Sequence, residues 1–405
     1  MMQDKFVVLG VTGSIAAYKA ADLASKLVQA HAKVDVIMTR EAREFITPLT
    51  FRSLTHRPVV TDLFDLNSEL SIEHVALAER ADIVVVAPCT ANTIAKITGG
   101  VSDDPLTTTI LATRAPVLIA PAMDGNMYQN PATQDNLERL KSRGIAIVGP
   151  AEGRLASGLI GKGRMVEPAA LLEHIKMVLG RKGDLAGLRV VVSAGGTQEP
   201  IDPVRVITNR SSGKMGFSIA EAARDRGATV TLITAPSSLP NPVGVHVVRV
   251  NRAVEMKDAV SEAVQQADTL IMAAAVADYQ PVDTSAQKIK KTSQDLSISL
   301  VKTPDILAEV RGSFVKVGFA AESENLIENA KSKLISKGLD LIVANDITAS
   351  DSGFGTDTNR VVFIRRDGEP EQLPLMLKYD VAHQILNRVA ELVTARRNEN
   401  SFQKS

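Results

Sequence analysis

The sequence has little of three features that would assign a protein to a specialised class. Among 405 residues there is one cysteine, Cys89, so no internal disulfide framework can form and a reducing compartment is expected. Lysine plus arginine and aspartate plus glutamate both total 46, and a net charge of zero gives no support for a nucleic-acid or membrane-surface partner. No apolar run approaches the roughly 18 residues that a membrane span needs. Asp4, Lys5 and Gly10 interrupt the apolar start, so no signal peptide is indicated and we expect a cytoplasmic protein.

The order of apolar runs and helical segments predicts the fold class. The contents of 45% apolar and 23% charged residues are globular values, and the length suits two or three domains. Residues 5–39 and 188–235 share one plan, with a strand, a glycine-containing turn, an amphipathic helix and a second strand. Continuous apolar strands that alternate with helices indicate buried, mostly parallel sheets. We predict two three-layer α/β/α domains, 1–183 and 184–405, joined by the polar, glycine-rich linker 179–187.

A glycine-rich loop that follows the first strand of the second half is a candidate anion site. It runs from Gly195 to Gly216 (GGTQEPIDPVRVITNRSSGKMG), and a helical segment begins at Lys214. Glycines let the backbone approach a ligand, and amides at a helix N-terminus favour negative charge. A P-loop would need Ser or Thr after Lys214, where Met215 stands. The pattern therefore predicts a phosphate or carboxylate site, with an ordinary strand-to-helix turn as the alternative.

In the first half, hydroxyl side chains gather at the predicted carboxyl ends of the strands, where ligands of such sheets bind. They are Thr12, Ser14, Thr39, Thr90 and the run 107–109. Each could be a helix N-cap, but several on one edge favour the phosphate of a mononucleotide. The loop GVTGSIAAYK lacks the spacing of the dinucleotide fingerprint, which disfavours an NAD(P)-dependent oxidoreductase.

The motif DPVRVITNRSSGKMG (202–216) resembles the signature of the phosphopantothenoylcysteine synthetase domain in the family of bifunctional coenzyme A biosynthesis proteins. That family joins a flavin-dependent decarboxylase to a cytidylyl-activating ligase. The resemblance extends over the chain to about residue 396. It implies a flavodoxin- or Rossmann-like FMN domain at 1–183 and a Rossmann-like, CTP-dependent ligase domain at 184–405.

For the first half, the resemblance implies an FMN site, to which it assigns Gly13, Ser14, Thr39, Thr90, Asn92, Thr107 and Met123. It also makes His74 a base or orienting partner near flavin and substrate, although a lone helical histidine is more often a solvated or core residue. Loss of CO₂ from a plain cysteine carboxylate leaves an unstabilised carbanion. Prior oxidation of the thiol carbon by flavin gives a C=S group that accepts the electron pair.

Two positions of the first half depart from the family pattern. Asp124 of PAMDGNM stands where the family has an Asn that recognises the substrate carboxylate, so Asn126 is an alternative ligand. Ser157, in the glycine-rich flap Gly153–Met165, stands where the family has a Cys that protonates the intermediate. Ser157 either relays a proton from water, or turnover is slow or stops at the oxidised enethiol. Cys89 is expected to pack rather than to replace that acid.

For the second half, the resemblance implies CTP as co-substrate and Mg²⁺ bound by Asp278 between nucleotide phosphates. Asn209 and Arg205 are expected to hold the acyl-cytidylate, and Lys288 to neutralise the leaving pyrophosphate, although Lys288, Lys290 and Lys291 read alone as solvated charge. Lys333 and Lys337 are spaced i, i+4 and are either a surface pair or phosphate ligands. The full nucleotide set is Ala273, Ala274, Ala275, Asp278, Lys288, Thr303, Pro304, Asp305, Ile306, Phe319, Lys333 and Lys337.

The predicted function is therefore condensation of 4′-phosphopantothenate with cysteine, followed by decarboxylation of the product to 4′-phosphopantetheine. The rival hypotheses are a ligase whose flavin half is impaired by Ser157 and Asp124, an NAD(P)-binding oxidoreductase, and a non-catalytic flavin-binding partner protein. The resemblance further implies a homo-oligomer, with trimers through the first half and dimers through the second, hence a dodecamer. In that assembly His74 would serve a neighbour's flavin.

Overall fold

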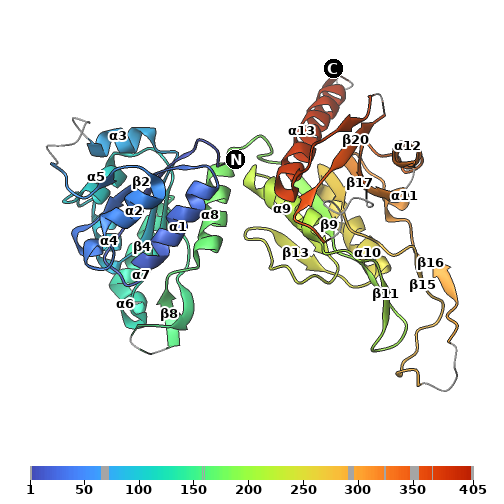
Figure 1. Cartoon of the computed structure of the whole chain (residues 1–405), viewed down its shortest axis with the longest axis horizontal. Helices are drawn as coiled ribbons and strands as arrows, with labels where there is room; N and C mark the ends of the chain where they lie inside the picture. Colours follow the sequence, from blue (N-terminus) through green and yellow to red (C-terminus); the bar gives the residue numbers. More distant parts are fainter. Residues whose placement is uncertain are drawn as a thin grey trace. The chain divides into compact units, whose positions relative to one another are not determined.

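The computed structural model describes residues 2–64, 73–156, 158, 160–290, 296–322, 325–346, 355–366 and 368–402. The chain forms two compact units, Met1–Leu179 and Gly180–Ser405 (Figure 1). This division falls four residues before the domain boundary predicted at 183/184. Each unit is a mostly parallel sheet covered by helices on both faces. The prediction of two three-layer α/β/α domains is therefore confirmed.

The first unit is built on a six-stranded parallel sheet in the order β3-β2-β1-β4-β5-β6. Every residue of β4 is buried, as expected for a central strand that is covered on both faces. The strands are β1 (Phe6–Val11), β2 (Lys33–Met38), β3 (Val59–Val60), β4 (Ile83–Cys89), β5 (Val117–Pro121) and β6 (Ala146–Ile147).

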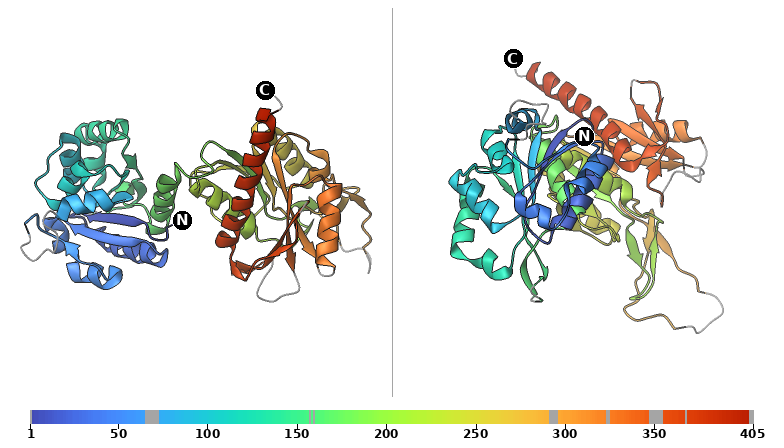
Figure 2. Two further views of the ribbon diagram at one scale, coloured as in Figure 1. Left: turned by 90° about the horizontal axis from the view of Figure 1, so that it is seen from above. Right: turned by 60° about the vertical axis from the view of Figure 1, so that its left-hand side comes forward.

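Helices cover both faces of this sheet (Figure 2). One face packs on α1 (Ala17–Gln29), α2 (Pro48–Thr55) and α8 (Pro168–Gly180). The other face packs on α3 (Glu73–Arg80), α4 (Ala91–Gly99), α5 (Pro105–Ala112) and α7 (Pro131–Ser142). A short helix, α6 (Gly125–Gln129), and the 3-10 turn η1 (Arg40–Glu44) follow β5 and β2. The antiparallel pair β7 (Ala151–Arg154) and β8 (Ile160–Arg164) lies in the segment predicted as a flap, and Met123 N–H donates to the Gly163 carbonyl at 3.0 Å.

The second unit has an eight-stranded sheet in the order β13-β12-β9-β14-β17-β18-β20-β21, in which the pairs as far as β18 are parallel and the last two are antiparallel. Its strands are β9 (Arg189–Ala194), β12 (Thr229–Thr234), β13 (His246–Arg249), β14 (Thr269–Met272), β17 (Val315–Glu322), β18 (Leu341–Asp346), β20 (Val361–Arg365) and β21 (Glu371–Gln372).

The helices of the second unit also divide between two faces. The core on one face contains α9 (Lys214–Asp225) and α13 (Lys378–Phe402). The opposite face carries α10 (Ala253–Ala263), followed by the turn η2 (Val264–Gln266), together with α11 (Ile306–Glu309) and α12 (Leu326–Ser336). The pair β19 (Thr358–Asn359) and β22 (Met376–Leu377) brings the segment before β20 to the start of α13.

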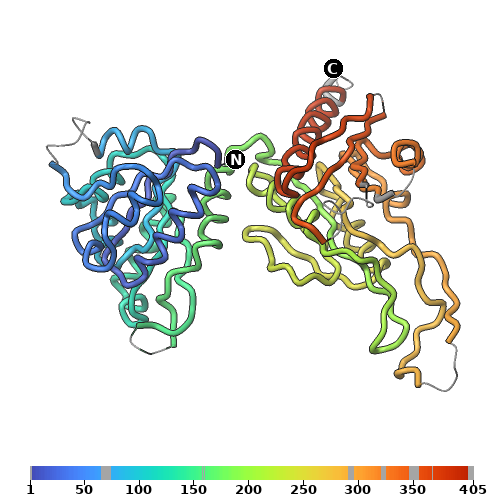
Figure 3. The backbone as a smooth tube through the Cα atoms, in the orientation of Figure 1, coloured from blue at the N-terminus to red at the C-terminus, as the bar shows by residue number. Residues whose placement is uncertain are grey.

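Two antiparallel ribbons extend from the body of this unit as an arm (Figures 1 and 3). One ribbon is β10 (Gln198–Pro200) with β11 (Val206–Thr208), and the other is β15 (Tyr279–Pro281) with β16 (Leu300–Lys302). The Ser285 N–H donates to the Ile201 carbonyl at 3.0 Å and joins the ribbons.

Candidate functional site

The first unit has a cavity of about 320 Å³ at the point where the strand order reverses, between β1 and β4. Ligands of open parallel sheets bind in the crevice at this switch point. The lining comes from the loops that follow β1, β2, β4 and β5 and from the helices that begin there. It comprises Gly13, Ser14, Thr39, Glu41, Thr90, Ala91, Asn92, Thr93, Lys96, Asp104, Ala122, Met123 and Met127.

The buried hydroxyl of Thr12 joins the loops on either side of this switch point. It donates to the Pro88 carbonyl at 2.8 Å and accepts from the Thr90 N–H at 3.1 Å. Gly13 follows directly, and a Cβ at this position would lie 2.5 Å from the Cβ of Glu41. The close approach of the two loops therefore requires glycine there.

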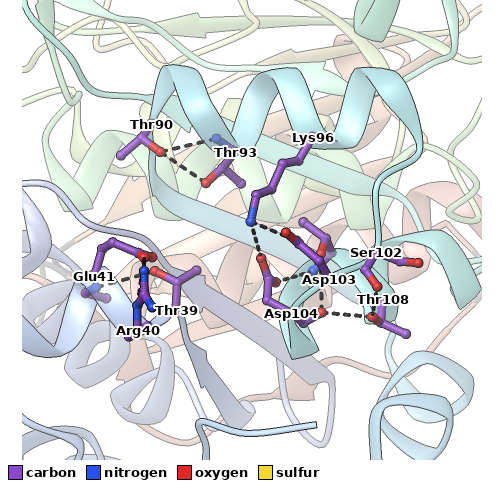
Figure 4. Close-up of polar contacts among 12 residues, drawn as sticks. Thr39, Arg40, Glu41, Thr90, Thr93, Lys96, Ser102, Asp103, Asp104 and Thr108 are labelled. Carbon is purple, nitrogen blue, oxygen red and sulfur yellow. Dashed lines mark hydrogen bonds and ion pairs between the residues drawn. The ribbon is translucent and has the colours of Figure 1, made fainter.

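The hydroxyls of this cavity are helix caps as well as lining groups. Thr39 caps η1 by accepting from the Ala42 N–H, and Thr90 caps α4 by accepting from the Thr93 N–H (Figure 4). A hydroxyl that accepts from a backbone N–H keeps a proton to donate. The helix-cap interpretation is therefore confirmed for Thr39 and Thr90. Their role in binding a phosphate stays a prediction, which the cap does not exclude because a capping hydroxyl can also donate to a phosphate oxygen.

One lysine lines the same cavity. Lys96 Nζ lies 2.7 Å from Asp103 Oδ1 and 3.1 Å from Asp104 Oδ2 (Figure 4). The hydrogen bond to Asp103, together with the contacts to Asp104, raises the pKa of Lys96, so the amine is cationic at neutral pH. The hydroxyl donors suit a phosphate monoester, Lys96 offsets the nearby carboxylates of Asp103 and Asp104, and the cavity volume lies within the range of small-ligand sites. The residues present therefore fit FMN.

Six of the seven residues predicted for FMN line this cavity: Gly13, Ser14, Thr39, Thr90, Asn92 and Met123. Thr107 does not, because it is buried in the first turn of α5, where its N–H and hydroxyl both bond to Asp104. His74 lies on α3, outside the lining. Ser157 lies outside the described residues.

The two candidates for the substrate carboxylate lie at the start of α6, also outside the lining. Asp124 caps this helix, and its Oδ1 accepts from the Asn126 N–H at 2.9 Å. Met123 and Met127, on either side of these two residues in the chain, line the cavity, so Asp124 and Asn126 lie beside it.

The second unit has a larger cavity, of about 780 Å³, at its own switch point between β9 and β14. Most residues predicted for CTP line it, namely Ala273, Ala274, Ala275, Asp278, Thr303, Pro304, Asp305, Ile306, Phe319, Lys333 and Lys337. Asn209 is in the lining too. Its Nδ2 donates to the carbonyls of Ala275 at 3.4 Å and Val276 at 3.1 Å, which holds the loop after β14 against the loop after β9.

Lysines are numerous in this cavity, as a polyanionic ligand requires. The lining contains Lys214, Lys302, Lys333, Lys337 and Lys378. Among the described residues no group of three or more His, Cys, Asp or Glu side chains is placed to hold a metal ion. A Mg²⁺ ion that is bound mainly by phosphates and water needs only one or two carboxylates, and Asp278 can supply one.

Arg205 and Lys288, two further predicted residues, lie on the arm and not in the lining. Arg205 Nε donates to Asp202 Oδ2 at 2.9 Å, and Arg205 Nη2 donates to the Ile289 carbonyl at 2.9 Å. The Ile289 N–H donates to the same Asp202 oxygen at 3.2 Å. The Arg205 guanidinium lowers the pKa of Asp202, so the carboxylate is ionised. Arg205 and Asp202 thus join the two ribbons next to Lys288.

Several lining residues were not among the sequence candidates. In the first cavity they include Glu41, Thr93, Lys96 and Asp104, which lie on helices or at a helix start. Asp104 precedes Pro105, and this cap-and-proline pair was a usable signal. In the second cavity Lys378 comes from the start of α13, far along the chain from the other lining residues, and no local motif marks it.

Among the described residues, no helix has the length and apolarity that a bilayer crossing demands.

Comparison with known proteins assigns each unit to a family. Residues 1–180 match the family described as Flavoprotein, and residues 185–393 match the family described as DNA/pantothenate metabolism flavoprotein C-terminal domain. The coenzyme A biosynthesis bifunctional protein CoaBC of Bacillus subtilis is 44% identical over 398 residues, which is 97% of this chain and 98% of that protein. The protein of the same name from Vibrio cholerae is 46% identical over 393 residues, which is 96% of this chain and 98% of that protein.

A crystal structure of the C-terminal domain of a CoaBC protein is 39% identical and covers 53% of this chain and 99% of that chain, with a TM-score of 0.46. The family matches and the two nearly full-length relatives agree with the resemblance found in the sequence. The chain belongs to the family of bifunctional coenzyme A biosynthesis proteins.

Proposed function

We propose that the second unit condenses 4′-phosphopantothenate with cysteine at the expense of CTP, and that the first unit decarboxylates the product. The observation that carries this proposal is one cavity at the switch point of each sheet, in a chain that matches CoaBC proteins over nearly its whole length. The hydroxyl-lined cavity suits a flavin phosphate, and the lysine-rich cavity suits a nucleoside triphosphate with a second anionic substrate.

In the ligase reaction, a carboxylate oxygen of phosphopantothenate attacks the α-phosphorus of CTP, and the bond to the β-phosphate oxygen breaks to release pyrophosphate. The amine of cysteine then attacks the acyl carbon, CMP leaves, and the amine gives its proton to solvent. We assign to Asn209, which lines the cavity, a contact with the acyl-cytidylate. Lys333 and Lys337 neutralise the triphosphate, and Asp278 ligates the Mg²⁺ that accompanies it.

Lys288 and Arg205 enter this scheme through the arm. We assign to Lys288 the neutralisation of the leaving pyrophosphate, which requires the arm, or the arm of a second subunit, to reach the cavity. Arg205 fixes the backbone next to Lys288 by its bonds to Asp202 and Ile289. Its direct contact with the intermediate stays a prediction.

In the decarboxylase reaction, bound FMN supplies a transient oxidation of the thiol carbon, which makes loss of CO₂ possible. Ser14, Thr39, Thr90 and Lys96 hold the flavin phosphate. Asp124 or Asn126 receives the substrate carboxylate beside the flap. A trimer through this unit would bring His74 to a neighbour's flavin, and dimers through the second unit would give a dodecamer. Ser157 is the proposed proton relay, and these roles rest on the family resemblance.

The test of the ligase activity is pyrophosphate release from the purified chain. We expect release that depends on both CTP and 4′-phosphopantothenate, and a yellow protein that yields FMN on denaturation. Reactions that lack CTP or 4′-phosphopantothenate are the controls, and they should release no pyrophosphate. No release with all substrates present would leave the non-catalytic partner protein as the better hypothesis.

A ligase with an impaired flavin unit is the second candidate, because Ser157 and Asp124 differ from the family motifs. CO₂ release from 4′-phosphopantothenoylcysteine separates the two hypotheses. We expect measurable CO₂ from the native chain and faster release from Ser157→Cys. CO₂ from the variant alone would favour the impaired unit.

A further inference from the structure

One wall of the second cavity is a short connection between two elements of the fold. Every residue from 302 to 307 lines the cavity, and this stretch runs from the end of β16 into the start of α11. It includes residues 303–306, which are proposed to contact the nucleotide. The helix α11 has only four residues, and a helix this short is not stable on its own in water. The shape of the wall therefore depends on what holds α11 in place.

Apolar packing holds α11 against the sheet. Ile306 and Val310 are buried in the same core as residues of α10. Leu307 lies close to β17, because a Cβ at Gly318 would lie 3.3 Å from Leu307 Cδ1. Apolar attraction is non-directional, so these contacts keep the helix on the sheet without fixing its position along the strand.

The directional contacts of α11 come from the amine of Lys316, on β17. Lys316 Nζ donates to the Leu307 carbonyl at 3.0 Å and to the Val310 carbonyl at 2.7 Å. The last carbonyls of a helix have no partner within the helix, and a lysine side chain can satisfy them. Lys316 thus binds both a residue of the cavity wall and the residue that caps the end of α11.

Lys316 does not itself line the cavity. It is half-buried, and burial lowers the pKa of its amine, although the charge of Asp340 opposes this shift. The amine has therefore exchanged part of its hydration for the two carbonyl partners. The strand that carries Lys316 also brings Phe319 and Ala320 into the lining. Lys316 consequently joins the wall 302–307 to the strand that forms the neighbouring part of the cavity.

Two other lysines contact the same short segment through partly exposed ion pairs. Lys257 Nζ of α10 lies 2.5 Å from Glu309 Oε2, and Lys337 Nζ of α12 lies 3.2 Å from Asp305 Oδ2. Ion pairs between exposed side chains contribute little to stability. Lys316 differs from both, because it bonds to the main chain of α11 and so responds directly to the position of the helix.

We propose that Lys316 is a positioning residue for the ligase reaction, which fixes α11 on β17 and so keeps the wall 302–307 in place for the nucleotide. This inference rests on the proposed function, in which residues 303–306 contact CTP. Lys316 lies outside the lining, so it acts through α11 and not on the reacting atoms. A wall that binds the nucleotide equally in the ground state and the transition state affects KM more than kcat.

The test compares Lys316→Met, which keeps the apolar stem and removes the amine, with Lys316→Arg, which keeps charged donors. The measurements are the affinity of the full chain for CTP with Mg²⁺ by calorimetry, and kcat and both KM values in pyrophosphate release. We expect Lys316→Met to weaken CTP binding roughly 10-fold, as for lost hydrogen bonds to a charged group, and to raise the KM for CTP in parallel. The KM for 4′-phosphopantothenate should change much less, and Lys316→Arg should restore most of the affinity for CTP.

Lys257→Met and Lys331→Met are the matched controls. The first removes the exposed ion pair to the same helix, and the second removes an exposed charge of α12 that lies outside the lining. Both variants should bind CTP like the native chain. If Lys316→Met fails to fold, Lys316→Gln replaces it, because this variant removes the charge but keeps a polar side chain, and it should also weaken CTP binding.

The inference is overturned if removal of the Lys316 amine leaves the affinity for CTP unchanged, or if Lys257→Met loses as much affinity. It is also overturned if Lys316→Arg binds no better than Lys316→Met, or if affinity for 4′-phosphopantothenate falls equally, because a general loss of structure would then explain the effect. A native chain that binds CTP but releases no pyrophosphate would contradict the proposed function. The CTP affinities of the variants would still decide the role of Lys316.

Discussion

The Thr12 hydroxyl accepts a hydrogen bond from the Thr90 N–H at 3.1 Å while it donates to the Pro88 carbonyl at 2.8 Å. One buried side chain thus fixes the distance between the loops that follow β1 and β4. Those loops carry Ser14 and the Thr90 hydroxyl, which line the proposed FMN cavity. The shape of this cavity therefore depends on a residue that does not itself line it.

Thr12→Val should weaken FMN binding, because it leaves the Thr90 N–H and the Pro88 carbonyl without their buried partner. Loss of such a partner costs about 1–3 kcal/mol. The measurement is FMN affinity by fluorescence titration of the apoprotein, together with thermal unfolding. Thr12→Ser keeps the hydroxyl and should behave like the native chain, and equal FMN affinity in all three proteins would contradict this role.

Replacement of Asp202 separates two roles of Arg205. If Arg205 acts by bracing the arm beside Lys288, Asp202→Asn and Arg205→Met should both lower the ligase kcat, because either one breaks the same contact. If Arg205 instead binds the intermediate, only Arg205→Met should lower kcat strongly. From the bonds observed we expect the first result. Steady-state pyrophosphate release checks it, and native activity in Asp202→Asn would contradict it.

The pKa of Lys378, lowered to about 8, predicts two pH effects. The affinity of the second cavity for its anionic substrates should decline as the pH rises through about 8, because the Lys378 amine in its lining loses its charge. The charged groups that act on this amine are Lys214 and Asp357. Lys378→Arg stays charged at these pH values and should lack the decline. An affinity that stays constant from pH 7 to 9.5 in the native chain would contradict this effect.

The stability of the fold should increase with pH, whereas ligand binding should weaken. The folded-state pKa of Lys378 is below the unfolded value of 10.5. Between about pH 8 and 10.5 the unfolded chain therefore binds more protons, and this group makes the fold more stable as the pH rises. Thermal unfolding at pH 7.5 and 9.5 should show this contribution in the native chain and its loss in Lys378→Met. An identical pH response in both proteins would count against the buried position of the amine.

Gly216→Ala should destabilise the second unit and displace the start of α9. The added Cβ would lie 2.6 Å from the Ala194 Cβ and 2.7 Å from the Ser193 carbonyl oxygen, and overpacking of this kind costs about 1–3 kcal/mol. Thermal unfolding checks the effect. Gly99→Ala is a matched control in the first unit, where the nearest atom would lie 3.7 Å away. Equal losses in both variants would refute the close packing of α9.

The sequence predicted the sheets and much of each cavity for one physical reason. Continuous apolar runs such as Ile83–Cys89 must be covered on both faces, and the carboxyl ends of parallel strands share an edge. Residues within a few positions of such an end, including Ser14 and Thr90, then meet without further information. Local spacing was sufficient because the loops are short.

The remaining lining residues depend on tertiary packing. Lys96 reaches the first cavity from the second turn of α4, and Lys378 reaches the second cavity because β22 pairs with β19. Neither relationship has a local signature. Conversely, a motif identifies Arg205 and Lys288 as candidate site residues but does not predict where they lie in the fold. Both residues lie on the arm, outside the cavity lining.

The central claim is that the product of the second unit is the substrate of the first. Its most direct test is the release of labelled CO₂ from cysteine that carries the label in its carboxyl group. We predict that the native chain, supplied with FMN and Mg²⁺, releases labelled CO₂ only when CTP and 4′-phosphopantothenate are both present. Pyrophosphate release without labelled CO₂, or labelled CO₂ that does not depend on CTP, would contradict the account.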